Sequence, residues 1–206
     1  MERPTFISEA EALKHDPLFR DVLSGNEWAV NFLNELEIHD QGTLSHSGRV
    51  ARLFLSLSAT DKESEEIYEA KVLAGLLHDV GKTTIDPEVL NKQGPLSETE
   101  REIIKGHARA GYESVVSYNP LAARILVAHH EFQQDSYPRA EIRENMESLY
   151  SRDLALADGL DARLYERPYR EKSIPEAEVQ EDLSRHFPED RVRAGIATWK
   201  SFNSHL

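Results

Sequence analysis

Apolar residues recur every three to four positions along most of this chain, and this spacing constrains its fold more than any other feature. The period places apolar side chains on one face of an α-helix, whereas a strand needs strict alternation. Strand-like alternation is nearly absent, so we expect an all-α protein with roughly eight helices in one unit. The expected helices cover residues 27–36, 43–59, 61–80, 97–116, 120–128, 151–164, 175–185 and 190–202, with a short one after Asp86-Pro87.

Composition excludes several classes of protein. The chain has no cysteine, which rules out disulfides, thiolate metal sites and cysteine nucleophiles. Its net charge of −13 argues against general nucleic-acid binding and against docking to an acidic membrane. No apolar run approaches the ~20 residues of a membrane helix. The first residues lack the apolar core of a signal peptide, so we expect a cytoplasmic protein.

Five histidines occupy apolar helix faces, where a core histidine is a poor choice. His46 shares a stripe with Val50 and Leu53, and His78 continues the stripe of Ala70 and Ala74. The other three follow apolar residues by three or four positions, and Asp79 and Asp158 lie in similar places. The seven inward candidates are His46, His78, Asp79, His107, His129, His130 and Asp158.

One such histidine alone is more often a hydrogen-bonded core residue than a ligand. Seven buried imidazole and carboxylate groups need partners, and metal ions are the partner that all of them can share. Seven ligands exceed what a single ion usually takes from protein, so we expect two divalent ions that share a carboxylate. Ligands of this type suit iron or manganese best, with zinc or nickel as further candidates.

The chain resembles the HD-GYP subfamily of the HD metal-dependent phosphohydrolase superfamily. The resemblance covers about residues 40 to 203 and depends on motifs in matching order. These are Leu76-Leu77-His78-Asp79-Val80-Gly81-Lys82, Asp86 to Lys92, Gly94-Pro95-Leu96-Ser97, His107 with Gly111, His129-His130-Glu131, Tyr137-Pro138, Ala157 to Ala162, Arg167 to Arg170 and Phe187-Pro188-Glu189. It implies an HD-domain helical bundle over residues 40–206, with residues 1–39 as a helical appendage packed on it.

The resemblance also implies roles for individual residues. The family's dinuclear ligands match the same seven positions, with Asp79 as the bridging carboxylate. Lys82 matches a lysine near the scissile phosphate, so Asp79 and Lys82 are the expected catalytic residues. The expected substrate-binding residues are Lys82, Tyr137, Arg167 and Arg170, the two arginines holding phosphates of cyclic di-GMP.

Two positions depart from the family pattern. The loop over residues 129–138 is one residue shorter than the family's string and lacks both of its glycines. Gly42 stands where some members carry a glutamate that supports a third metal, which favours two ions here.

The favoured function is a signalling phosphodiesterase that hydrolyses cyclic di-GMP with a water bridging the two ions. Such ions, about 3.5–4 Å apart, lower the pKa of that water. The altered loop keeps two alternatives open. One is a general HD phosphohydrolase of nucleotides or phosphomonoesters, and the other is a catalytically weak module that binds a nucleotide or a protein.

Trp28, Phe32 and Leu33 could pack the N-terminal helix onto the bundle or onto a second subunit, which makes a homodimer possible.

Overall fold

The computed structural model describes residues 7–132, 136–138, 146–165 and 174–203. Within these ranges all regular structure is helical, with twelve α-helices and one 3-10 helix. The helices are α1 (Glu9–His15), α2 (Arg20–Gly25), α3 (Glu27–His39), α4 (Gln41–Leu57), α5 (Glu65–Leu77), η1 (Val80–Thr84), α6 (Pro87–Leu90), α7 (Glu98–Lys105), α8 (His107–Val115), α9 (Pro120–Val127), α10 (Met146–Leu164), α11 (Glu176–Leu183) and α12 (Glu189–Asn203).

The all-α class expected from the sequence is confirmed, but the described residues hold more helices than the roughly eight expected. Helices α1 and α2 precede the first expected helix. The stretch 97–116, expected as one helix, is divided at Gly106 into α7 and α8. Short helices carry too few apolar positions for their period to stand out, which explains why the first two were missed.

Side-chain hydrogen bonds cap the starts of several helices. Ser97 and Glu100 form a capping box at the start of α7, and the Asp86 carboxylate accepts a hydrogen bond from the Glu88 amide at the start of α6. Helix α5 begins later than the expected residue 61, because Ser64 caps it. Helix α10 begins at Met146, before the expected residue 151.

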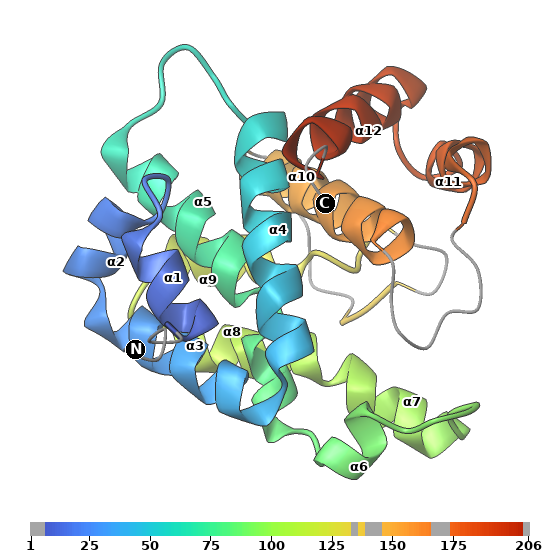
Figure 1. Cartoon of the computed structure of the whole chain (residues 1–206), viewed down its shortest axis with the longest axis horizontal. Coiled ribbons are helices and arrows are strands. Elements are labelled where there is room, and N and C mark those ends of the chain that lie inside the picture. Colours follow the sequence, from blue (N-terminus) through green and yellow to red (C-terminus); the bar gives the residue numbers. More distant parts are fainter. Residues whose placement is uncertain (1–6, 133–135, 139–145, 166–173, 204–206) are drawn as a thin grey trace, which may run out of the picture.

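Helix α4 runs through the middle of the bundle and lies against α3, α5, α10 and α12 (Figure 1). Helix α9 packs against α5, α8 and α10, so α4 and α9 both border the same interior. The apolar core between them contains large, fully buried side chains such as Phe54, Leu53, Leu73 and Ile125. Burying a side chain of this size stabilises the fold by roughly 1.5–3 kcal/mol. These helices supply most of the chemistry-bearing side chains described below.

The N-terminal helices share this core. Helices α1 and α3 both lie against α4 (Figure 1). Helix α3 also contacts α5 and η1. Leu13, Leu33 and Leu36 from these helices are buried in the same apolar cluster as the residues of α4 and α5. Residues 9–39 are therefore packed closely on the rest of the bundle.

Helices η1 and α8 meet backbone to backbone at Gly81. A Cβ atom at this position would overlap the carbonyl oxygen of His107 and lie 2.6 Å from the amide nitrogen of Gly111. Only glycine leaves room for this approach. The contact brings the end of α5 beside the start of α8, which is where Asp79 and His107 are found.

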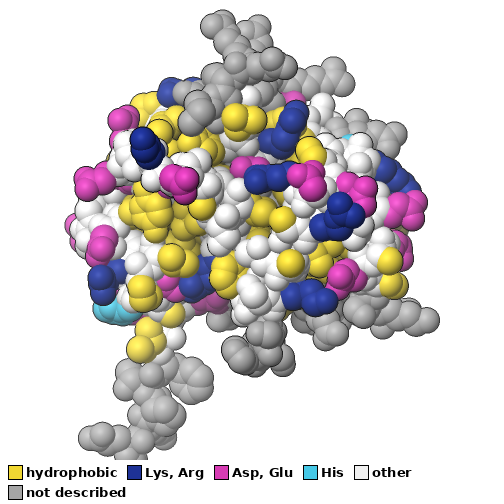
Figure 2. Space-filling view, turned by 90° about the horizontal axis from the view of Figure 1, so that it is seen from above, with side chains coloured by type: hydrophobic (Ala, Val, Ile, Leu, Met, Phe, Trp, Pro, Cys, Tyr) yellow, Lys and Arg dark blue, Asp and Glu magenta, His cyan; other side chains and the backbone are white. Residues whose placement is uncertain are grey.

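The surface carries charges of both signs. Figure 2 shows Asp and Glu side chains interspersed with Lys and Arg on one face, together with exposed hydrophobic groups. Among the described residues, no helix is both long and apolar enough to cross a membrane.

Candidate metal centre

Two groups of three side chains gather in the interior of the bundle. The potential ligand atoms of His46, His78 and Asp79 all lie within 4.8 Å of one another. Those of His107, His129 and His130 meet the same limit. Asp158 joins the first group, since its Oδ1 lies 2.9 Å from His46 Nε2. All seven residues singled out in the sequence are thus brought into one cluster.

Five separate parts of the fold deliver these side chains. His46 lies in α4, His78 and Asp79 follow α5, His107 begins α8, His129 and His130 follow α9, and Asp158 lies in α10. Six of the seven residues are buried, and His130 is half-buried. Polar groups buried in this number need compensating partners, because each one loses its hydration.

Three of the histidines are oriented by the same local contact. The Nδ1 atoms of His78, His107 and His129 lie 2.9, 2.7 and 2.6 Å from the carbonyl oxygens of the residues three positions earlier. A carbonyl can only accept, so each Nδ1 carries the hydrogen. In the neutral ring, the lone pair is then on Nε2. Histidine ligands of metals usually donate their other nitrogen in this way.

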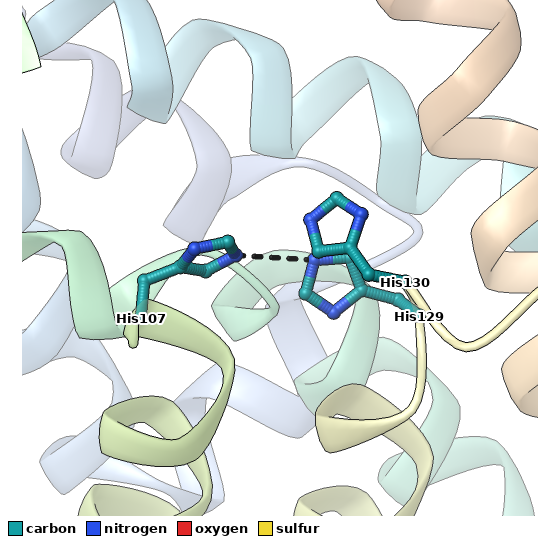
Figure 3. A group of neighbouring side chains, drawn as sticks. All are labelled: His107, His129 and His130. Carbon is teal, nitrogen blue, oxygen red and sulfur yellow. Dashed lines mark hydrogen bonds between the residues drawn. The ribbon is translucent and has the colours of Figure 1, made fainter. Parts of the chain in front are cut away.

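The Nε2 lone pairs face one another or other electron-rich atoms. His107 Nε2 and His129 Nε2 are 3.4 Å apart, the contact drawn as a dashed line in Figure 3. His78 Nε2 is buried, has no hydrogen-bond partner and lies 3.5 Å from the Asp79 carboxylate. A cation between such atoms would turn repulsion into attraction. The donor set, imidazole nitrogens and carboxylate oxygens, therefore fits divalent metal ions.

The environment keeps three imidazoles neutral. Burial lowers the pKa of His130 to about 4 and also lowers that of His107. The pKa of His129 lies well below its ordinary value, through burial and the neighbouring His130. Neutral imidazole is the form that binds a metal ion.

Asp79 lies between the two groups of ligands. Its Oδ2 is 3.5 Å from His78 Nε2, and its Oδ1 is 3.4 Å from His107 Nε2. Burial opposes ionisation of this carboxyl, yet the ammonium of Lys82 beside it holds its pKa well below the usual range. Lys82 Nζ donates to Asp79 Oδ2 at 2.6 Å, and its side chain is partly exposed. The carboxylate can therefore serve both groups at once.

His46 is held between two carboxylates. Its Nε2 contacts Asp158 at 2.9 Å and its Nδ1 contacts Asp161 at 2.7 Å. Burial opposes the charged ring, but these hydrogen bonds raise the pKa of His46 to about 9. The hydrogen bond from His46 and the charge of its ring lower the pKa of Asp158, against the effect of its burial.

The structure places Tyr137 at the edge of this cluster. Its ring stacks on His130 with 4.5 Å between centroids and lies edge-on to His107. The two expected phosphate-binding arginines, Arg167 and Arg170, lie outside the described residues.

Sequence reasoning assigned no role to Asp161, Arg49 or Trp199, which surround His46. Helical spacing carried a signal for two of them. Asp161 follows Asp158 by three positions and Arg49 follows His46 by three, so each shares a face with a candidate ligand.

The fold and the cluster define a class: a helical bundle whose interior gathers histidine and aspartate side chains suited to divalent metal ions. The chain belongs to the HD domain family, whose family model matches residues 43–163. This match spans all seven clustered residues. Divalent metal use follows from the family and fits the chemistry of the cluster.

Curated relatives include cyclic dinucleotide phosphodiesterases. The chain is 36% identical over 144 residues to the cyclic di-GMP phosphodiesterase response regulator RpfG of Xanthomonas campestris, covering 66% of this chain and 37% of the relative. It is 30% identical over 142 residues to the cyclic di-GMP phosphodiesterase PA4108 of Pseudomonas aeruginosa, covering 67% and 34%. It is 31% identical over 170 residues to the 3′3′-cGAMP-specific phosphodiesterase 1 of Vibrio cholerae, covering 78% and 39%.

These similarities confirm the resemblance to HD-GYP-type phosphodiesterases inferred from the sequence. The chain spans well under half the length of the three relatives named above.

Proposed function

We propose that this chain binds two divalent metal ions in the buried cluster and hydrolyses a phosphodiester bond of a cyclic dinucleotide. The position of Asp79 carries the proposal. Its two oxygens reach both groups of histidines, at 3.5 Å from His78 and 3.4 Å from His107. A carboxylate that bridges two ions needs this placement.

The proposed ligands divide into two sets. His46, His78 and Asp158 would hold one ion, and His107, His129 and His130 the other, with Asp79 shared between them. The absence of thiolate and the mixture of imidazole and carboxylate favour iron or manganese, with zinc or nickel also compatible.

The residues around the cluster support phosphate chemistry. When bound, two divalent ions supply an activated water near neutral pH and neutralise negative charge on phosphoryl oxygens. Lys82 keeps Asp79 ionised, and its partly exposed ammonium can donate to a phosphate oxygen of the substrate. We assign Asp79 and Lys82 to the catalytic centre on these grounds.

We propose cyclic di-GMP as the substrate, with 3′3′-cGAMP as the second candidate. Relatives named for each of these substrates support the choice. Tyr137, at the edge of the cluster, offers a ring against which a substrate group can pack. Arg167 and Arg170 remain the proposed contacts to the outer phosphates.

The test uses the whole chain, stripped of metal with EDTA and reloaded separately with Mn²⁺ or Fe²⁺. Each preparation is incubated with cyclic di-GMP, with 3′3′-cGAMP, and with a panel of mononucleotides and phosphomonoesters. We expect the wild type to convert a cyclic dinucleotide to its linear form and Asp79→Ala to leave it intact.

Other outcomes of that test support the alternatives. Turnover of mononucleotides alone would contradict the assigned substrate and favour a general phosphohydrolase, which the short, glycine-free loop at 129–138 motivates. Metal-loaded protein that binds a cyclic dinucleotide without cleaving it would instead favour a binding module.

Three further features stay predictions. We propose that residues 40–206 form the catalytic unit and residues 1–39 an appendage packed on it. A cytoplasmic location is proposed because cyclic dinucleotides act as internal signals. A homodimer through the N-terminal helices is testable by light scattering, with Phe32→Ala expected to weaken it.

A further inference from the structure

Asp161 is a fully buried carboxylate that accepts hydrogen bonds from three side chains. On α10 it follows Asp158 by three positions. Its oxygens lie 2.7 Å from His46 Nδ1 and 2.9 Å from both Nε and Nη2 of Arg49. Trp199 Nε1 of helix α12 donates to the same carboxylate at 3.1 Å. Helices α4, α10 and α12 therefore meet at one acidic group.

These contacts determine which nitrogen of His46 faces the cluster. The Asp161 carboxylate accepts hydrogen bonds from Arg49 and Trp199, whose nitrogens can only donate, so it is the acceptor toward His46 as well. His46 Nδ1 therefore carries the hydrogen of this bond. Nε2 then points to Asp158, at 2.9 Å, and to the other candidate ligands. Rotation of the ring would break the contact with Asp161.

The donors on Asp161 are themselves held in place. The Arg49 guanidinium lies over the ring of Tyr165, 3.5 Å from its centroid, while two of its nitrogens bond the carboxylate. A planar guanidinium stacked and paired in this way has little freedom. Trp199 is half-buried and belongs to the last helix described, α12. The HD family match ends at residue 163, so Trp199 lies beyond it.

We propose that Asp161 is a positioning residue that orients His46 toward the metal ions, and that Trp199 makes helix α12 part of this support. The proposal rests on the metal site proposed above and adds a residue that contacts a ligand rather than an ion. Outer contacts to histidine ligands typically change metal affinity by about 10- to 100-fold when they are removed. Loss of one of several donors to Asp161, as in Trp199→Phe, should have a smaller effect.

The experiment measures metal binding directly, with Mn²⁺ alone by calorimetry and Co²⁺ alone by its visible absorption. We expect Asp161→Asn to weaken one Mn²⁺ site by about 10- to 100-fold and to change the Co²⁺ spectrum. We expect Trp199→Phe, which keeps the ring packing, to weaken the same site by about 3- to 10-fold, below the range for full removal of an outer contact. The second site should keep its wild-type affinity in both variants.

Two matched controls separate positioning from general stability. Asp153→Asn removes a different carboxylate of α10, one that pairs with Arg191 of α12. Trp28→Phe removes an indole hydrogen bond, to Asn26 at 2.9 Å, in the N-terminal part of the chain. Either control can lower the unfolding temperature of the metal-free protein, but both should leave Mn²⁺ affinity and the Co²⁺ spectrum as in the wild type.

The outcomes distinguish the two proposals. Wild-type protein that takes up neither metal would overturn the metal site and, with it, the positioning role. If the wild type binds the metals and both Asp161→Asn and Trp199→Phe bind them equally well, the positioning role alone would be overturned. An equal loss of metal affinity in Asp153→Asn would also overturn it, because helix packing would then explain the effect.

Discussion

His107 Nε2 and His129 Nε2 lie 3.4 Å apart, although each ring already donates its Nδ1 hydrogen to a carbonyl in the preceding helical turn. Burial lowers the pKa of both rings, so neither supplies a proton to this contact. Two lone pairs at this distance repel each other. The fold holds them together, and a cation would relieve the repulsion.

Metal addition should therefore stabilise the protein. Mn²⁺ at about 100 times its dissociation constant is expected to raise the free energy of unfolding by about 2.7 kcal/mol. His129→Ala should lose most of this gain, because it removes one ligand of the second group. Thermal unfolding of EDTA-treated protein, with and without Mn²⁺, measures the effect. His186→Ala, at an exposed position, is the control. An equal Mn²⁺ shift in His129→Ala would contradict the expectation.

Gly81→Ala should destabilise the protein and disturb the cluster. The added Cβ would collide with the His107 carbonyl, and backbone cannot move aside as a flexible side chain can. Overpacking of this kind costs about 1–3 kcal/mol, occasionally more. Urea unfolding measures the cost. Gly25→Ala is the matched control, since a Cβ atom added there would meet no neighbouring group within 4 Å. Equal stability of the two variants would show that η1 and α8 do not pack as described.

Tyr137 should matter for substrate through its ring rather than its hydroxyl. Its stacking on His130 predicts that Tyr137→Phe keeps most of the activity. We expect the ring to pack against a group of the substrate. Loss of such an aromatic contact, worth about 0.5–1.5 kcal/mol, predicts that Tyr137→Ala lowers kcat/KM up to about tenfold. Steady-state kinetics with cyclic di-GMP provide the measurement. Tyr118→Ala removes a ring stacked on Trp28 instead and should leave kcat/KM unchanged. A large loss in Tyr137→Phe would instead assign the role to the hydroxyl.

The capping box of α7 predicts a pH-dependent contribution to stability. Hydrogen bonds from Lys92 and from Ser97 lower the pKa of Glu100 from 4.5 to about 2. A carboxyl with a depressed pKa stabilises the fold above its unfolded value, and the contribution is lost as pH falls from about 4.5 toward 2.

Glu100→Gln should therefore be less stable than the wild type near neutral pH, and the difference should shrink below about pH 4.5. Urea unfolding at several pH values measures it. Glu98→Gln, in the same helical turn, should give a smaller difference that varies less with pH. A difference for Glu100→Gln that stays constant down to about pH 3 would show that the pKa is not depressed in the fold.

Local spacing was enough to predict much of the cluster. His46 and His78 lie on apolar helix faces, so a helical period alone placed them in the interior. His107 is buried as well, but Ile103, the apolar residue four positions earlier, is exposed on the preceding helix, so this spacing does not explain the burial of His107. The capping box of Ser97 and Glu100 could also be recognised in the sequence, because its two residues are three positions apart. Local spacing could not predict contacts between different helices, such as the contact of Asp79 with His107.

The hydrogen bonds that hold His46 in place could not be predicted from the sequence for the same reason. Asp161 bonds His46 across 115 positions and Trp199 across 38, and no local period encodes such pairs. The division of 97–116 at Gly106 was missed because apolar spacing continues across it. There His107 directs Nδ1 to the Ile104 carbonyl, a side-chain contact that spacing does not reveal.

The most direct test of the central claim is the metal content of the purified chain. Elemental analysis after loading with Mn²⁺ should give about two ions per chain for the wild type and one or none for Asp79→Ala. Asp190→Ala, exposed on α12, should match the wild type. Wild-type protein without bound metal, or Asp79→Ala that keeps the full complement, would contradict a cluster built around a shared carboxylate.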